Sequence, residues 1–148
     1  MHRFWDKEGK YRDGFLKDYQ YWSLEVSFRQ HTLGCFIIFC KRPIEKISEL
    51  KDKELIELGL VMKKIEDALL KNPTFKPERF NYLQLGNALH NLHFHGIPRY
   101  KTKRDFAGKI WKDETFGHPP IWSDEEVNAE LVLEIKKEIE KFLNHHIF

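Results

Sequence analysis

The feature of this 148-residue chain that most constrains its fold is a run of six apolar side chains at residues 35–40. The run lies between Gly34 and Lys41 and is far shorter than the ~20 residues of a membrane-spanning helix. Such a run predicts a central strand covered on both faces, or the hairpin partner of the strand before it. Upstream, residues 24–28 alternate between apolar and polar side chains, which predicts a half-buried strand. A sheet is therefore expected at the centre of the fold.

Two segments show the three-and-four spacing of apolar residues that is typical of amphipathic helices. The first is expected to begin near Asp52, a good N-cap residue, and to end at Asn72. Its stripe comprises Leu55, Leu58, Met62, Ile65 and Leu69. The second follows Ser123, which forms a capping-box signature with Glu126. Its stripe comprises Val127, Leu131, Ile135, Ile139 and Phe142.

Two further strands are expected at residues 80–85 and 92–98, and a short polar connection joins them. Strands connected in this way usually lie side by side and antiparallel. Residues 105–122 are rich in glycine, proline and aromatic side chains, which predicts a loop that either covers a pocket or packs down on the fold. The expected fold class is α+β, with a mostly antiparallel sheet, one central helix and one C-terminal helix.

The length of the chain predicts one domain, residues 1–148, with an adequate hydrophobic core. Residues 1–21 show no clear period and are expected to form an irregular N-terminal extension, whereas residues 123–146 form the C-terminal helix. There is no apolar leader and no apolar run long enough to span a membrane, so a cytoplasmic, reducing location without a membrane partner is expected. Cys35 and Cys40 would face opposite ways on one strand, which argues against a disulfide between them.

The charge balance limits the possible partners. Lysine and arginine number 25 and aspartate and glutamate 23, a net charge of +2, so general nucleic-acid binding is not expected. One local run is basic and comprises Arg99, Lys101, Lys103 and Arg104. This run either steers a small phosphorylated substrate or is a solvated loop.

Residues 85–100 contain the clearest sign of chemistry. His90, His93 and His95 fall close together, with Asn91 between the first two. On a strand, His93 and His95 share one face with Asn91, whereas His90 is out of register and belongs to a bend. A single histidine beside apolar residues is usually a satisfied core residue. Two histidines in register between glycines favour a functional site.

The sequence HFHGIPR, preceded by LGNALHNL, resembles the signature of the histidine triad (HIT) superfamily of nucleotide hydrolases and transferases. That signature has three histidines separated by single apolar residues and followed by a short apolar pair, proline and arginine. His93 and His95 match its second and third histidines, and Asn91 stands at the position of the first. The resemblance extends more weakly over residues 22–117 and implies a HIT-like α+β fold.

The resemblance also implies roles for the matching residues. His93 would be the nucleophile and His95 would contact the phosphate, whereas Asn91 replaces a histidine that supports the site by hydrogen bonding. A homodimer formed through the sheet and the helix is implied as well. The positions implied to contact the nucleotide are Asn81, Gly86, Asn87 and Ala88.

The expected chemistry follows from the properties of imidazole. An unperturbed pKa of about 6.5 leaves much of the imidazole neutral near pH 7, so its nitrogen can attack the α-phosphorus of a nucleotide. Attack would give a nucleotidyl-histidine intermediate, which water then cleaves. The substrates that the resemblance implies are dinucleoside polyphosphates, nucleoside phosphoramidates or related adenylylated compounds. Positioning and charge stabilisation supply most of this catalysis, so no cofactor is expected.

Two other functions remain compatible with the sequence. The three histidines of residues 90–95, with His118, could bind Zn²⁺, but no cysteine or carboxylate lies at ligand spacing, so no metal is assigned. The chain could instead bind nucleotides without turnover. The amide of Asn91 cannot relay a proton, and Ala88 lies where some relatives carry a hydroxyl that assists the leaving group.

Overall fold

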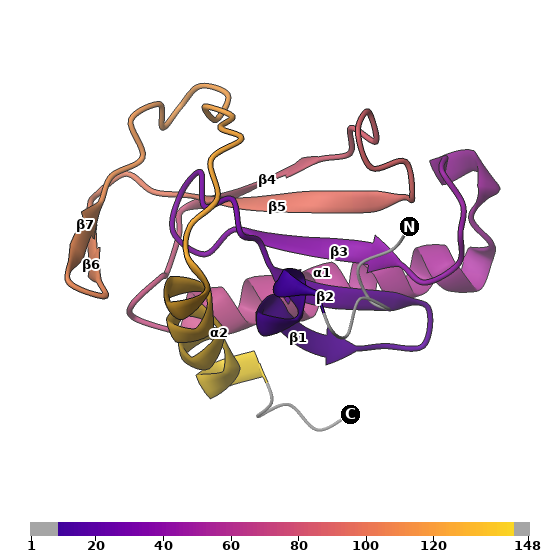
Figure 1. Ribbon diagram of the computed structural model, residues 1–148, viewed down its shortest axis with the longest axis horizontal. Helices are drawn as coiled ribbons and strands as arrows, with labels where there is room; N and C mark the ends of the chain where they lie inside the picture. The colour runs from indigo at the N-terminus through magenta and orange to yellow at the C-terminus, as the bar shows by residue number, and fades with distance from the viewer. Residues whose placement is uncertain (1–8, 144–148) are drawn as a thin grey trace.

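The computed structural model describes residues 9–143 and has a five-stranded antiparallel sheet at its centre, with the strand order β1-β2-β3-β5-β4 (Figure 1). Two helices complete an α+β fold of the expected class. The strands are β1 (Phe15–Asp18), β2 (Trp22–Val26), β3 (Phe36–Cys40), β4 (Arg79–Leu83) and β5 (His93–Arg99). The helices are α1 (Asp52–Lys71) and α2 (Ala129–Leu143), with short 3₁₀ turns at Lys10–Gly14 and Ile47–Glu49.

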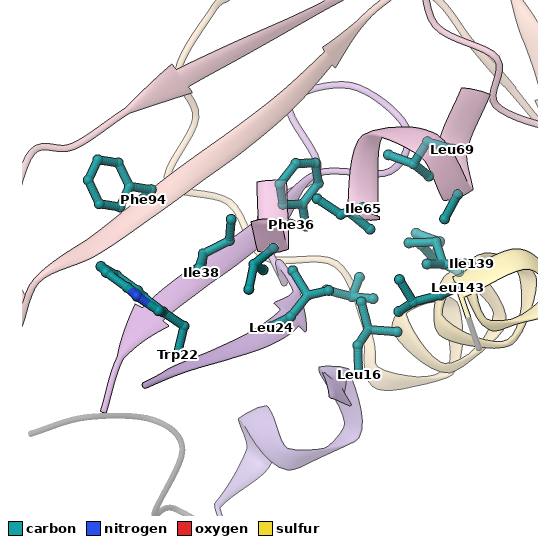
Figure 2. Packing of buried hydrophobic residues seen from close by; sticks show 14 of the residues in the cluster. Leu16, Trp22, Leu24, Phe36, Ile38, Ile65, Leu69, Phe94, Ile139 and Leu143 are labelled. Carbon is teal, nitrogen blue, oxygen red and sulfur yellow. The ribbon is translucent and has the colours of Figure 1, made fainter. Parts of the chain in front are cut away.

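The hydrophobic core lies between one face of the sheet and the two helices (Figure 2). Trp22 and Leu24 of β2 are fully buried there, as are Ile65 and Leu69 of α1. Helix α2 packs beside α1 and adds Ile139 to the same cluster. One face of the sheet is therefore used entirely for packing, which leaves the opposite face for a site.

The helices differ from expectation at their starts. Asp52 is the first helical residue of α1 and not its cap, because the N–H of Lys51 donates to the Glu54 carboxylate at 2.8 Å. Helix α2 begins six residues after Ser123, since Asn128 accepts from the N–H of Leu131 and so caps the helix itself. The last part of the expected helix lies outside the described residues. Within residues 9–143, no helix is both long and apolar enough to cross a membrane.

The strands also correct the sequence analysis in three places. Strand β2 is buried on both faces and not on one, because Ser23 and Glu25 are only 3% and 6% exposed. Strand β1 lies inside the segment expected to be an irregular extension, of which residues 1–8 are outside the described part. The expected 105–122 loop includes most of a hairpin, formed by β6 (Arg104–Phe106) and β7 (Lys109–Trp111).

Gly96 allows close contact between β5 and β3. It pairs in register with Phe36, and a Cβ atom at residue 96 would lie 2.2 Å from the Phe36 ring. We expect Gly96→Ala to lower the free energy of unfolding by about 1–3 kcal/mol, because the ring must move within a packed core. Urea denaturation of the wild type and of Gly96→Ala measures this change in the free energy of unfolding. Gly59→Ala is the control: apart from neighbouring residues and the nearby backbone of α1, no atom lies within 4 Å of that Cβ, so a gain of about 0.4–1 kcal/mol is expected.

Candidate active site

His93 and His95 project from β5 onto the face of the sheet opposite α1, because Phe94 between them belongs to the core. Their partners across the β3–β5 ladder are Phe39 and Ile37, respectively. The two histidine side chains meet edge to face, with ring centroids 4.9 Å apart. His93 is 6% exposed and His95 8%. The expectation that these two histidines share one face is confirmed.

The ring of His93 is fixed on two sides. Phe39 stacks on it with centroids 4.9 Å apart and the planes 22° from parallel. Its Nδ1 lies 2.7 Å from the backbone carbonyl of Asn91. A carbonyl can only accept, so this hydrogen bond assigns the proton to Nδ1 and leaves the lone pair of the neutral ring on Nε2. The nitrogen with nucleophilic character is therefore Nε2.

Asn91 braces the start of β5. Its amide nitrogen donates to the backbone carbonyl of Cys40 at 3.0 Å, and the N–H of Cys40 donates to Leu92 at 3.0 Å. The side chain of Asn91 is 7% exposed, so this hydrogen bond satisfies a buried polar group. The amide thus fixes the backbone whose carbonyl orients His93. Cys40 and Cys35 are both free thiols and buried.

Trp122 lies against His95, edge to face, with centroids 4.9 Å apart. The His31 ring also lies against Trp122, with ring centroids 4.3 Å apart. The Nδ1 of His31 accepts the backbone N–H of Ser123 at 3.2 Å. Burial lowers the pKa of His31 and the charge of Arg29 lowers it further, against a smaller opposing effect of Asp124. A neutral His31 near pH 7 fits its role as an acceptor.

Arg99 forms a second buried cluster of polar contacts on the same face of the sheet as the two histidines. Its guanidinium forms a two-point ion pair with Asp113, at 2.7 and 3.1 Å, and both side chains are only 3% exposed. It also donates to the backbone carbonyls of Thr115 and His118 and to the side-chain oxygen of Asn81. Burial alone would raise the pKa of Asp113, but the hydrogen bonds from Arg99 and other donors lower it below its usual value.

These contacts resolve part of the basic run found in the sequence. Arg99 is buried and paired, and Arg104 donates to the carbonyl oxygen of Phe75 at 2.7 Å, so both guanidiniums hold the fold together. Lys101 and Lys103 remain exposed. The positive charge available at the surface is thus smaller than the sequence indicates.

Asn81 lines an open groove of about 1140 Å³ between β4 and residues 116–120. Because its carboxamide oxygen accepts from Arg99, its N–H groups are the polar edge left to bind a ligand. Leu83, also in the groove, pairs in register with His95. The groove therefore lies beside the histidine pair, although neither His93 nor His95 lines it.

The segment 86–88 lies in the connection between β4 and β5. Asn87 and Ala88 are exposed, and Gly86 adopts a positive φ of 66° in the connection before β5. His90 is exposed and lines a separate shallow hollow with Gly86. Within residues 9–143, no three histidine, cysteine or acidic side chains lie together in a way that could hold a metal ion.

Four residues of the site were missed from the sequence. Phe39, His31, Trp122 and Asp113 are distant from β5 along the chain and carry no motif. A partial signal existed for Trp122, because the aromatic residues of its loop were expected either to cover a pocket or to pack down. Trp122 does contact His95, whereas Trp111 of the same loop packs into the core.

Comparison with known proteins identifies relatives of this arrangement. Residues 27–102, slightly more than half of the chain, match the model of the HIT domain family. No curated protein matches the sequence significantly.

Solved structures match over most of the chain. A histidine triad protein from Sinorhizobium meliloti has a TM-score of 0.67 and 20% identity, covering 89% of this chain and 91% of its own. A hypothetical histidine triad nucleotide-binding protein from Sulfolobus tokodaii has a TM-score of 0.60 and 20% identity, with 91% coverage of both. Diadenosine triphosphate hydrolase from Plasmodium falciparum has a TM-score of 0.65 and 13% identity, covering 90% of this chain and 78% of its own. At these identities the likeness shows a shared fold.

Proposed function

Because the chain belongs to the HIT domain family, we propose that it is a nucleotide hydrolase or nucleotidyl transferase with His93 as nucleophile. The observation that carries the proposal is the hydrogen bond between His93 Nδ1 and the carbonyl of Asn91, which leaves Nε2 unprotonated in the neutral ring. Asn91 would stand at the first position of the triad. The side-chain amide of Asn91 donates to the Cys40 carbonyl and so holds the backbone of Asn91 in place. The Asn91 carbonyl can therefore orient His93 without a histidine at the first position of the triad.

The proposed reaction has two displacements. His93 Nε2 attacks the α-phosphorus, an N–P bond forms, and the bond from phosphorus to the leaving group breaks with its electron pair. Water then attacks the same phosphorus, the N–P bond breaks, and a nucleoside monophosphate is released with the histidine restored. A nucleotidyl transferase would use an acceptor other than water in the second step. Each step needs an in-line approach of the attacking atom to phosphorus.

The other residues would bind substrate. His95, which packs against His93, would contact a phosphate oxygen, and the N–H groups of Asn81 would donate to the nucleotide. Gly86 and Asn87 would approach the phosphates when a nucleotide is bound. At Ala88 a methyl group offers no proton to the leaving group, so that proton would come from elsewhere. The substrates are proposed as dinucleoside polyphosphates, phosphoramidates or related adenylylated compounds.

We also propose that two copies of the chain pair as a homodimer. Strand β4 is one of the two edge strands of the sheet, and α1 exposes Ile56 and Leu60, at 66% and 52%, one turn apart on its outer face. An open edge and an exposed apolar face are features that a partner commonly covers.

The test is mass spectrometry of the intact protein, quenched without acid after brief mixing with a diadenosine polyphosphate or with an adenosine phosphoramidate. A mass increase of one AMP, mapped to His93, is the expected result. The substrate that gives the adduct identifies the leaving-group class. Nucleotide binding with neither adduct nor AMP release would instead favour a nucleotide-binding protein without turnover, because Asn91 cannot relay a proton.

A further inference from the structure

A continuous row of aromatic rings crosses the site. Phe39 stacks on His93, His93 meets His95 edge to face, and His95 meets Trp122 edge to face at 85°. The row ends at His31, whose ring lies over Trp122 at a tilt of 31°. His93 and His95, the two histidines of the proposed reaction, therefore lie between Phe39 on one side and Trp122 on the other.

The two ends of the row differ in how they are held. Phe39 belongs to β3 and is fixed by the sheet ladder, in register with His93. Trp122 lies in an irregular segment, so its place depends on local contacts. An edge-to-face pair fixes the relative orientation of two rings, because the positive edge of one faces the negative face of the other. Trp122, which lies outside the sheet, is thus one of the contacts that orient His95, together with His93.

Four contacts fix the segment around Trp122. His31 covers the indole ring and accepts the N–H of Ser123, so one side chain holds both the ring and the backbone that follows it. The N–H of Val127 donates to the carbonyl of Phe28 at 2.8 Å. The indole N–H donates to Asp124 at 3.2 Å.

Among the residues that the structure describes, the buried Nε2 atom of His31 has no hydrogen-bond partner. Since Nδ1 accepts, Nε2 carries the proton in the neutral ring, and a buried N–H without an acceptor is destabilising. The contacts of His31 with Trp122 and Ser123 offset the free-energy cost of this unpaired N–H.

We propose that Trp122 is a positioning residue that fixes the imidazole of His95 for phosphate contact, with His31 holding Trp122 in place. The inference rests on the proposed function, because the orientation of His95 matters only if His95 meets the substrate. Trp122 itself takes no part in bond making. A displacement of about 1 Å in a catalytic group can reduce a rate by about 10²-fold.

The first test is kinetic and uses the full chain. Trp122→Ala is expected to lower kcat by about 10- to 100-fold with a change in KM of less than about threefold. Trp122→Phe, which keeps a ring edge near His95, should recover most of the rate. His31→Ala should give an intermediate loss. The matched control is Ile121→Ala, since Ile121 is the neighbouring residue, is 61% exposed, and should leave kcat within about twofold.

The second test measures the contact between His95 and Trp122 directly and does not depend on turnover. In NMR spectra, the ring protons of His95 should be shifted by the ring current of Trp122. These shifts should disappear in Trp122→Ala, persist in part in Trp122→Phe, and remain in Ile121→Ala. Circular dichroism on each variant checks that the fold is retained. If Trp122→Ala does not fold, both the kinetic and the NMR measurements are made on His31→Ala instead.

The outcomes separate this inference from the proposed function. An active wild type whose Trp122→Ala variant keeps full kcat, or loses rate without recovery in Trp122→Phe, overturns the positioning role and leaves the function intact. Unchanged His95 proton shifts in Trp122→Ala overturn it as well. A wild type that forms no adduct and no AMP removes the proposed function, and the positioning role with it.

Discussion

His93→Ala is expected to form no AMP adduct and to lose turnover by at least about 10³-fold, because removal of a nucleophile leaves only binding and charge stabilisation. The Nε2 atom of His93 has the required lone pair, since the Asn91 carbonyl accepts the hydrogen bond from Nδ1–H. Quenched-flow mass spectrometry and AMP release measure the two effects. Nucleotide affinity should persist within a few fold, because His95 and Asn81 remain.

The matched control is His90→Ala, a histidine three residues earlier that is exposed and belongs to the connection before β5. Its turnover should match the wild type within about twofold, since surface changes away from a site have small effects. Thermal unfolding of His93→Ala is needed as well, because the variant loses the stacking contact with Phe39. Adduct formation that continues in His93→Ala would assign the nucleophile to another residue, with His95 the first to examine.

Most of the fold was predictable because its elements have strong periodic patterns. The apolar run at residues 35–40 predicted the buried β3, and the alternation around His93 predicted β5. Strand β1 was missed because four residues, one of them buried, carry almost no pattern. Leu55 was assigned to the inner stripe of α1 and is 44% exposed, since the buried positions shift to Val61 and Ala68 farther along. The local spacing of apolar residues does not show which of two neighbouring faces of a helix packs against the core.

The site was predictable where the chain itself places residues together. His93 and His95 are two residues apart on one strand, so alternation alone puts them on one face. Contacts across long sequence separations were not predictable. Trp122 reaches His95 only through a segment whose path depends on His31 and on the capping of α2 by Asn128. No property of the local sequence specifies that path.

The buried pair of Arg99 and Asp113 is the other case of a contact that the sequence conceals, and its loss should have the largest effect on stability. We expect Asp113→Ala to lower the free energy of unfolding by about 3–5 kcal/mol, because it leaves a buried guanidinium without its counter-charge. The remaining acceptors, the carbonyls of Thr115 and His118 and the Asn81 side chain, are neutral. Urea denaturation at pH 7 measures the change, which is a large fraction of a typical 5–15 kcal/mol.

The control is Asp105→Ala in β6, which removes an exposed carboxylate from the neighbouring hairpin and should change stability by no more than about 0.5 kcal/mol. A pH series adds a second check. The pKa of Asp113 is lowered in the folded state, so its contribution is fully present above the unfolded value of about 3.9 and is lost as pH falls through the folded value. The difference between wild type and Asp113→Ala should therefore shrink only below about pH 4. A difference under about 1 kcal/mol at pH 7 would mean that the remaining neutral acceptors are sufficient to hold Arg99, and that Asp113 is dispensable for anchoring the loop that leads to Trp122.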